Sequence, residues 1–304
     1  MTFEIRAARS HEEYRAVEQL QREVWQLEDV EIVPDHVLRT AHGNGGLLLV
    51  AFEELPRQTQ RLVGFVFGLV GLTADHTLKH CSHMMGVAPG YRDRGLGYRL
   101  KLAQRERVLD QGIDLVTWTF NPLESRNAYL NFHKLGATCS TYLRDLYGAM
   151  RDELNTGLPS DRFRVEWQIG SEHVERRLRG DLEPLSPSPL RSPERTPNTL
   201  SALLSAGVPI VNAFSPSPLR GPERPRVPQN VRPLEGDRLL VQIPADFQAI
   251  RAVDLALACA WRAHTRALFE TAFAAGYVVI DLLFERGQSC YLLWKGDPYE
   301  DRTD

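Results

Sequence analysis

An arginine and two glycines at fixed spacing follow a short apolar strand near residue 90 of this chain. Within the stretch 81–98, Pro89 ends the strand, and Arg92, Gly95 and Gly97 then stand at the start of a long helix. Glycine allows the backbone to come close to a ligand, and the first N–H groups of a helix have no partner within the helix. Because the helix dipole adds partial positive charge there, this turn predicts a binding site for phosphate groups.

Two other phosphate-binding motifs do not fit the turn. A dinucleotide site requires Gly-x-Gly-x-x-Gly and a P-loop requires Gly-x-x-x-x-Gly-Lys-Ser/Thr, and neither pattern is met. The order strand, Val87-x-Pro89, Tyr91, Arg92-x-x-Gly95-Leu96-Gly97 and helix resembles the acyl-CoA signature of the GCN5-related N-acetyltransferase (GNAT) superfamily, in a bacterial two-part form. The resemblance covers about Phe3 to Ile169.

The resemblance implies a fold and a co-substrate. The fold is α/β (α+β), with a mixed, mostly antiparallel, splayed central sheet flanked by helices. A C-terminal α/β extension resembles a degenerate half of the same fold. The co-substrate is acetyl-CoA or another acyl-CoA, whose arm pairs with strand edges in the splay. The residues implied in binding it are Met85, Val87, Arg92, Arg94, Gly95, Leu96, Gly97, Tyr98, Asn121 and Asn127, with Ser125 at a matching position. Capping or surface roles are the alternative for Ser125 and Asn127.

Acyl transfer to an amine requires a proton acceptor, because ordinary amines are mostly protonated at pH 7. His83 lies four residues before Val87, which predicts that both face the same side of the strand. Its ordinary pKa is close to neutral pH. In the arylalkylamine-acetylating branch of the superfamily a histidine at a similar position belongs to the proton path. The alternative is a packed strand histidine.

The general acid departs from the family pattern. The family places a tyrosine four residues before the glycine that ends the helix after the splay. That glycine corresponds to Gly136, and the tyrosine position holds Phe132, which cannot donate a proton. Tyr129, one turn earlier, is the substitute we predict, and a core aromatic is the alternative. His133 points about a hundred degrees away from Phe132 on a regular helix.

The acceptor is predicted to be a small-molecule amine or an amino acid. A likeness to superfamily members that accompany N-acylamino-acid racemases makes succinyl transfer to an amino acid an alternative. Arg162 and Arg164 could then pair with a substrate carboxylate, or both could be solvated. Two further alternatives stay open: a non-catalytic CoA-binding sensor or interaction protein, and acetylation of a protein lysine or N-terminus.

Composition excludes several other classes. The 304 residues carry a net charge of −3 with 25% charged residues, which indicates a globular protein and no nucleic-acid partner. Four scattered cysteines and the lack of an apolar leader predict a cytoplasmic protein. The longest apolar run, Leu62 to Leu72, is too short to span a membrane. His76, His80 and His83 lack the spacing of a metal site, so no metal is predicted. A homodimer remains open.

The chain is predicted to have three parts. Residues 1–170 form the acyl-CoA-binding domain, 180–235 a Pro/Ser-rich linker and 236–304 a C-terminal α/β segment. The linker contains a near-repeat, at 186–195 and 215–224, too rich in proline and serine to form a core. A short ordered piece is allowed at 200–214. The expected helices are one capped by Ser10, then 34–42, 97–111, 124–135 and one running from Asp254 to Gly276. The expected strands are 3–6, 47–52, 62–72, 84–87, 113–120, one from Ala137 onwards, 239–243, 277–284 and 289–294. On the helix at 97–111 and the residue before it, the side chains expected to face inward are Leu96, Leu100, Ala103 and Val108.

Overall fold

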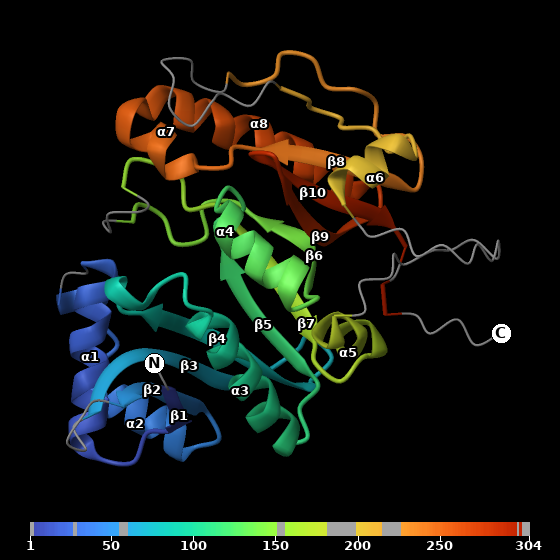
Figure 1. Ribbon diagram of the computed structural model, residues 1–304. Helices are drawn as coiled ribbons and strands as arrows, with labels where there is room; N and C mark the ends of the chain where they lie inside the picture. Colours follow the sequence, from blue (N-terminus) through green and yellow to red (C-terminus); the bar gives the residue numbers. More distant parts are fainter. Residues whose placement is uncertain are drawn as a thin grey trace. The chain divides into compact units, whose positions relative to one another are not determined.

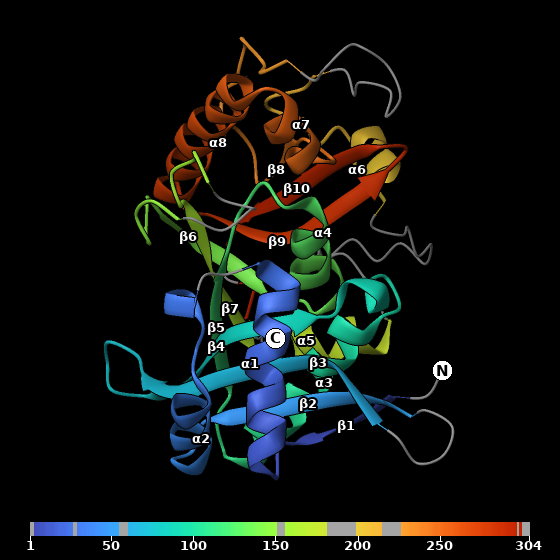
Figure 2. The same ribbon diagram turned by 90° about the vertical axis from the view of Figure 1, so that its left-hand side faces the viewer.

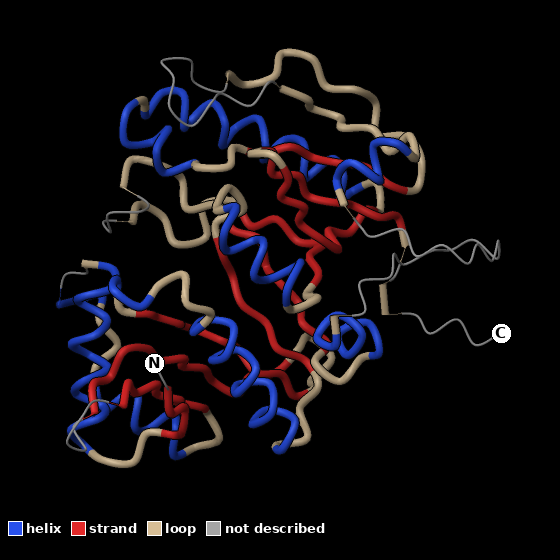
Figure 3. The backbone as a smooth tube through the Cα atoms, in the orientation of Figure 1, coloured by secondary structure: helices blue, strands red, loops and turns tan. Residues whose placement is uncertain are grey.

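A computed structural model describes residues 3–26, 29–54, 60–150, 156–180, 199–214, 226–296 and 298–299. The chain divides into two compact units (Figure 1). The first unit comprises Met1–Trp118 with Arg151–Thr156, and the second comprises Thr119–Met150 with Gly157–Asp304. Both units combine a sheet with helices (Figure 3). In the described part of the chain, no helix is both long and apolar enough to cross a membrane.

The sheet of the first unit has the strand order β1-β2-β3-β4-β5. Strands β1 to β4 pair with one another in antiparallel fashion, and β4 pairs with β5 in parallel on its other side. The strands are β1 (Phe3–Ala7), β2 (Leu47–Glu54), β3 (Gln60–Leu72), β4 (Leu78–Val87) and β5 (Leu115–Phe120). Most residues of β2 and the centre of β3 are buried on both faces, which explains their continuous apolar runs.

Strands β4 and β5 pair over a short length. The parallel ladder contains only His80 with Val116 and Cys81 with Thr117. Beyond Cys81, the rest of β4 pairs with β3 on its other side, from Ser82 to Val87. The splay predicted between two parallel strands is therefore confirmed on the β4 side, and it begins after Cys81.

Helices cover both faces of this sheet (Figure 2). Successive residues of β3 face opposite sides of the sheet. A Cβ at Gly64 would meet Leu96 and Leu100 of α3 (Leu96–Asp110), whereas Phe65 contacts Trp25 of α1 (His11–Trp25). Ser10 caps α1 as predicted, its side chain accepting from the N–H of Glu13. The helical segments of this unit are α1 (His11–Trp25), η1 (Asp29–Glu31), α2 (Asp35–Gly43), η3 (Pro89–Tyr91) and α3 (Leu96–Asp110).

The second unit has a wholly antiparallel sheet in the order β7-β6-β9-β10-β8. Its strands are β6 (Thr138–Leu143), β7 (Arg162–Gln168), β8 (Arg238–Ile243), β9 (Tyr277–Glu285) and β10 (Gln288–Lys295). Its helices are α4 (Ser125–Ala128), η4 (Tyr129–Lys134), α5 (Glu172–Arg179), α6 (Leu200–Ser205), α7 (Phe247–Val253) and α8 (Leu255–Ala274). Strand β6 joins the C-terminal strands through the bridge between Cys139 and Val279.

The predicted fold class is confirmed: both units are α/β, and the strands are mostly antiparallel. The predicted helices and strands are present, most of them within a few residues at their ends, but the strand predicted at 84–87 begins at Leu78. The elements α5, α7 and β7 were not predicted, and α6 occupies the piece allowed at 200–214. The two copies of the Pro/Ser-rich near-repeat lie outside the described residues. The three-part domain organisation remains a prediction, since a division by contacts falls at Trp118, within the range covered by the resemblance.

The β9–β10 hairpin contains a strained turn residue. Arg286 has a φ of 50° and Gly287 a φ of 79°, as a two-residue type I′ turn requires. Arginine has a Cβ and disfavours this left-handed region, which asparagine tolerates better. We expect Arg286→Asn to raise the free energy of unfolding by about 0.5–1 kcal/mol. Thermal unfolding would measure this change, and a lower melting temperature than that of the wild type would contradict it.

Candidate functional site

The turn between β4 and α3 is held by short-range hydrogen bonds. Pro89 begins the single turn η3, in which the N–H of Tyr91 donates to the carbonyl of Ala88 at 2.9 Å. The Tyr91 hydroxyl donates to the carboxylate of Glu53, a buried residue of β2. This contact fixes the turn against the sheet, so the residues that follow are held in a defined position.

Arg92 fastens the same turn to two other elements. Its Nε donates to the carbonyl of Val87 at 3.4 Å, and its Nη2 donates to the carbonyl of Val24 at 3.1 Å. The guanidinium therefore connects the end of β4 with the last turn of α1. Arg94 lies over the ring of Tyr91, with 5.4 Å between its guanidinium carbon and the ring centroid. Both arginines are exposed and add positive charge to the turn.

Gly95 is the N-cap of α3 and leaves the helix start open. Its φ is 75° and its ψ is 3°, a left-handed conformation suited to glycine. A Cβ built on Gly95 would meet no atom within 4 Å, and no side chain caps the helix. The first turn of α3 contains no acidic residue. These features fit a phosphate group, because the first N–H groups of a helix lack partners within the helix and the positive end of this 15-residue helix faces open space.

A β-bulge changes the expected position of His83. Met84 pairs with Phe67 and Ser82 pairs with Gly68, so His83 is an extra residue on β4. Ser82 then bonds to α3, whereas Met84 packs on the core formed with α1. His83 and Val87 would share a face only if residues alternated along β4 without a break. The bulge interrupts that alternation, and the position of His83 depends on the bulge itself.

His83 is solvent-exposed and close to an aromatic ring. Its imidazole lies 6.0 Å from the ring of Phe67 in an edge-to-face arrangement, and partial loss of hydration against the neighbouring protein atoms lowers the pKa of His83 below its ordinary value. The histidine is therefore neutral at pH 7 and can accept a proton. Met85 and Val87, further along β4, are half-buried.

A buried lysine below the β4–β5 pairing was not identified from the sequence. Lys101 of α3 is 3% exposed, and its Nζ donates to Ser82 Oγ at 2.8 Å and to Gln104 Oε1 at 3.1 Å. The Nζ also lies 4.0 Å from the ring centroid of Trp118. Burial lowers the pKa of Lys101 to about 7. Lys101 and Gln104 are buried on the inward face of α3. Ala103, which the sequence pattern predicted to face inward, is only half-buried.

The lysine belongs to a buried polar network. Gln104 Nε2 lies 3.1 Å from His80 Nε2, whose imidazole is fully buried. The other ring nitrogen of His80 has no hydrogen-bond partner among the described residues. Burial first, and then the charge of Lys101, lower the pKa of His80 to about 4. His80 is therefore part of this network and is held in the neutral form.

Three residues implied in CoA binding lie in the second unit. Asn121 Oδ1 accepts from the N–H of Leu123 at 3.0 Å, so this side chain forms a turn after β5. Ser125 Oγ lies 2.7 Å from Ser289 Oγ of β10, and both residues are buried. Asn127 is exposed on α4. Each position remains a prediction, with structural roles evident for Asn121 and Ser125.

The helix after α4 has π geometry from Tyr129 to Lys134. Phe132 is fully buried and packs against Phe120 and Tyr291. Tyr129 stacks on His133 with 4.5 Å between ring centroids, and burial raises the pKa of Tyr129. Residues four apart are neighbours on a helix surface, which allows these two rings to stack.

The two arginines considered for a substrate carboxylate have partners already. Arg162 is buried and its Nη1 donates to the carbonyl of Asp161 at 2.9 Å. Arg164 is exposed, and its Nη2 donates to Thr141 Oγ1 at 3.3 Å. Pairing of these residues with a substrate remains untested.

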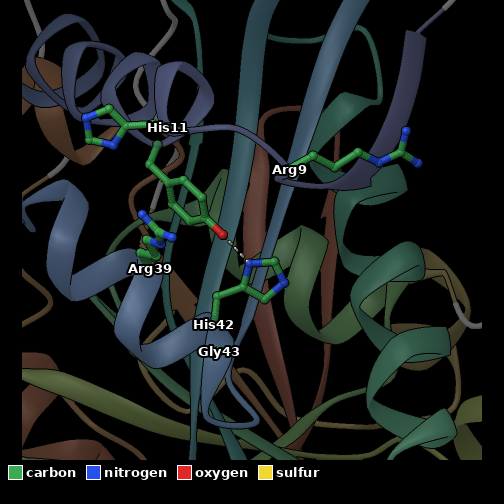
Figure 4. A pocket seen from close by; sticks show the side chains of 6 residues that line it. Arg9, His11, Arg39, His42 and Gly43 are labelled. Carbon is green, nitrogen blue, oxygen red and sulfur yellow. Dashed lines mark hydrogen bonds between the residues drawn. The ribbon is translucent and has the colours of Figure 1, made fainter.

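A cationic pocket of about 520 Å³ lies at the opposite end of α1 from the Arg92 turn (Figure 4). Tyr14 donates or accepts a hydrogen bond with His42 Nδ1 at 2.8 Å inside it. Its lining residues are Arg9, His11, Tyr14, Arg39, His42 and Gly43.

The glycine-rich turn after α2 is held by its own backbone, since the N–H of Gly46 donates to the carbonyl of Ala41 at 2.8 Å. Within the described residues, no group of three potential ligands is arranged to hold a metal ion.

Comparison with known proteins gives matches among solved structures. No protein-family model matches the sequence, and no curated protein matches it. A NatC complex bound to Gag peptide and CoA is 15% identical, with a TM-score of 0.45 over 55% of this chain and 99% of that chain. The ribosomal-protein-S18-alanine N-acetyltransferase from Escherichia coli is 14% identical, with a TM-score of 0.42 over 55% and 94%. A putative acetyltransferase from Salmonella typhimurium, solved with acetyl-CoA, is 14% identical, with a TM-score of 0.43 over 57% and 96%. These likenesses concern the fold alone.

Proposed function

We propose that this chain is an acyl-CoA-dependent N-acyltransferase of the GNAT superfamily, transferring an acetyl group to the amine of a small molecule. The observation that carries the proposal is the open, uncapped start of α3 below the Arg92–Gly97 turn. This start follows a strand whose edge is released from its parallel neighbour after Cys81. A free strand edge followed along the chain by a phosphate site suits a ligand that has a diphosphate and an extended, amide-containing arm.

Binding of the diphosphate is assigned to backbone donors. The N–H groups of the first turn of α3, beginning at Leu96 and Gly97, would donate to the diphosphate, and a Cβ at Gly95 would meet no atom within 4 Å. Arg92 holds the turn closed through two backbone carbonyls, and Arg94 adds charge. The free edge of β4 near Met85 and Val87 would pair with the amides of the arm.

His83 is the proposed proton acceptor. A thioester bound along β4 would supply the electrophilic carbonyl for attack by a neutral amine. His83 would take the proton that the amine loses, since its neutral imidazole is accessible. Backbone N–H groups around Val87, on the edge of β4 that is not paired with β5, would polarise the carbonyl oxygen. Tyr129 remains the proposed proton donor to the leaving thiolate.

The function is tested by thiol release from purified protein. Acetyl-CoA and succinyl-CoA are each offered with a panel of amino acids and simple amines. Acceptor-dependent release supports an N-acyltransferase, and preference for succinyl-CoA with an amino acid would select the succinyltransferase alternative. Tight CoA binding by calorimetry without release for any acceptor would favour the CoA-binding sensor, an alternative motivated by the buried Phe132. A cytoplasmic location and a homodimer remain predictions.

Replacing His83 should remove the proton acceptor without disturbing the core. We expect His83→Gln to lower kcat by about 10²–10⁴-fold, the usual contribution of general acid–base catalysis, with little change in the affinity for CoA. In the wild type, the rate should fall as the pH decreases below about 6.5, because the lowered pKa keeps His83 neutral down to that range. The pH–rate profile would measure this. The same acid limb in His83→Gln would contradict the role, and His76→Gln, on an exposed turn, is a matched control.

A further inference from the structure

The cationic pocket at the start of α1 has no part in the proposed acyl transfer. Its volume is about 520 Å³, and its lining residues come from the residues just before α1, from the first turn of α1 and from α2 (Figure 4). None of the described lining residues is acidic. Sites that hold small organic molecules usually have volumes of about 300–1,000 Å³. The pocket therefore combines the size of a ligand site with a positively charged lining.

Arg9 and Arg39 supply the positive charge of the pocket. Both side chains are exposed, and neither guanidinium has a hydrogen bond or an ion pair with another described residue. Figure 4 shows the two guanidinium groups on opposite sides of the Tyr14–His42 pair. Arginine binds the oxygens of a phosphate or a carboxylate through two parallel N–H donors. The pocket thus offers two separate groups for binding anions.

Two carboxylates that contact lining residues are engaged by other groups. Glu13 accepts from Arg6 Nη1 at 3.0 Å and from Arg6 Nη2 at 2.6 Å, and its Oε2 also accepts from the backbone N–H of Arg9 at 2.6 Å. Asp35 Oδ2, at the start of α2, lies 3.5 Å from His11 Nδ1. Among the described residues, no carboxylate pairs with either guanidinium group of the pocket, so both are available to an anionic ligand.

Tyr14 and His42 form the middle of the pocket and add a neutral donor. Tyr14 is 8% exposed, and its hydroxyl lies 2.8 Å from His42 Nδ1. Burial lowers the pKa of His42, so the imidazole is neutral at pH 7. When Nδ1 accepts from the hydroxyl, the ring proton is on Nε2, which has no partner among the described residues. The middle of the pocket therefore suits a polar, uncharged group.

A ligand that matches this arrangement has an anionic group at each end and a polar body between them. We propose that the pocket binds a small organic molecule with two anionic groups, one paired with Arg9 and the other with Arg39, and with a hydroxylated body that meets His42. Such a ligand would connect the start of α1 with α2. This inference goes beyond the proposed function and does not rest on it.

The pocket is separate from the phosphate site proposed at the start of α3. Helix α1 has 15 residues, which gives it a length of roughly 20 Å. The pocket lies at the first turn of this helix, whereas Arg92 bonds to the carbonyl of Val24 near its last residue. Ligands at the two ends would not compete, so we expect saturating CoA to leave binding in the pocket unchanged.

The test measures binding to the full chain by calorimetry, at about 0.15 M salt so that weak long-range attraction is screened. The probes are fructose bisphosphate, fructose monophosphate and fructose, which differ in the number of anionic groups. Adipate is a fourth probe that has carboxylates in place of phosphates. We expect the bisphosphate to bind about tenfold or more tightly than the monophosphate, and fructose to show no binding.

Each arginine variant should remove the advantage of the second anionic group. Arg9→Gln and Arg39→Gln should each lower the affinity for the bisphosphate by about 10- to 100-fold and abolish its preference over the monophosphate. Arg9→Lys keeps the charge without the two parallel donors and should give an intermediate loss. Arg107→Gln removes an exposed arginine of α3 outside the pocket and should change neither value. Gly95→Asp, at the start of α3, should also leave the affinity for the bisphosphate unchanged.

The possible results separate this inference from the proposed function. It is overturned if neither the bisphosphate nor adipate binds, if CoA displaces the bound probe, or if either arginine variant keeps the preference while circular dichroism shows it folded. Binding of adipate in place of the bisphosphate would keep the site and assign it to dicarboxylates. Probe binding with the expected losses, but without thiol release from acyl-CoA, would support the pocket and reject the acyltransferase. Thiol release without probe binding would do the reverse.

Discussion

Replacing Lys101 by methionine should make this protein more stable at pH 7, by about 1–4 kcal/mol. Lys101 is 3% exposed and has hydroxyl, amide and aromatic neighbours but no carboxylate within the described network. Methionine fills a similar volume without a charge to desolvate. Ser82 and Gln104 keep a partner after the change, because Ser82 Oγ already donates to Gln104 Oε1 at 3.1 Å.

The pH dependence of this effect follows from the direction of the shift. Burial lowers the pKa of Lys101 from 10.5 to about 7, which corresponds to roughly 5 kcal/mol. Between these two values the unfolded chain binds more protons than the folded protein, so the free energy of unfolding rises with pH from about 7 to 10.5. Below pH 7 the lysine is protonated in both states, and its full cost is present.

Urea unfolding at pH 6, 7, 8.5 and 10 would measure both effects. Wild-type stability should rise across this series more steeply than that of Lys101→Met, and the two proteins should converge at high pH. Lys101→Arg is the matched control, because arginine stays protonated and should destabilise the protein without a gain between pH 7 and 10. If Lys101→Met is less stable than the wild type and its free energy of unfolding rises with pH just as steeply, the buried amine is not the source of the pH dependence.

The free-energy cost of burying Lys101 also bears on whether this residue serves a functional site. Natural sequences retain such groups where they confer specificity or serve a site, and perturbed pKa values concentrate at functional positions. Lys101 bonds to Ser82, the residue next to the last β4–β5 pair at Cys81. Methionine at this position should therefore be tested for CoA binding as well as for stability.

Replacing Gly95 by aspartate should reduce CoA affinity by about 100-fold or more. The carboxylate would stand at the uncapped start of α3, where it would compete for the free N–H donors and repel a diphosphate. Folding should be little affected, because a Cβ at Gly95 meets no atom within 4 Å and aspartate tolerates a φ of 75° better than most residues.

The matched control is Gly95→Asn, which has the same shape and no charge. Calorimetry with CoA should show a loss of about tenfold or less for asparagine, so the difference between the two variants reports the charge. Equal losses for both would indicate a steric or backbone effect instead. Unchanged CoA binding in Gly95→Asp, with thermal stability retained, would exclude α3 as the phosphate site.

The sequence by itself determined the parts of this protein that depend on neighbouring residues. Pro89 and Gly95 set the turn before α3 through backbone geometry, Ser10 and Asp254 cap their helices through bonds three residues ahead, and Arg286-Gly287 closes a two-residue hairpin. Alternation and helical spacing located most of the strands and helices for the same reason. These signals are short-range, so they are visible in one sequence.

Only the tertiary structure decided which residues lie together. The bulge at His83 depends on pairing with β3, and it changes the face of the strand between Ser82 and Met84. Lys101 is long and cationic, and the sequence pattern gave no reason to place it in the interior. The π geometry from Tyr129 to Lys134 likewise has no signal in the sequence.

The burial of charged side chains in the second unit shows the same limit. Arg262 is 2% exposed and Glu124 is half-buried, and neither belongs to a recognisable motif. Burial then determines their chemistry, since it leaves Nε and Nη1 of Arg262 without a hydrogen-bond partner among the described residues and raises the pKa of Glu124. Neither property follows from residue type, because both depend on how far the rest of the chain shields these side chains from water.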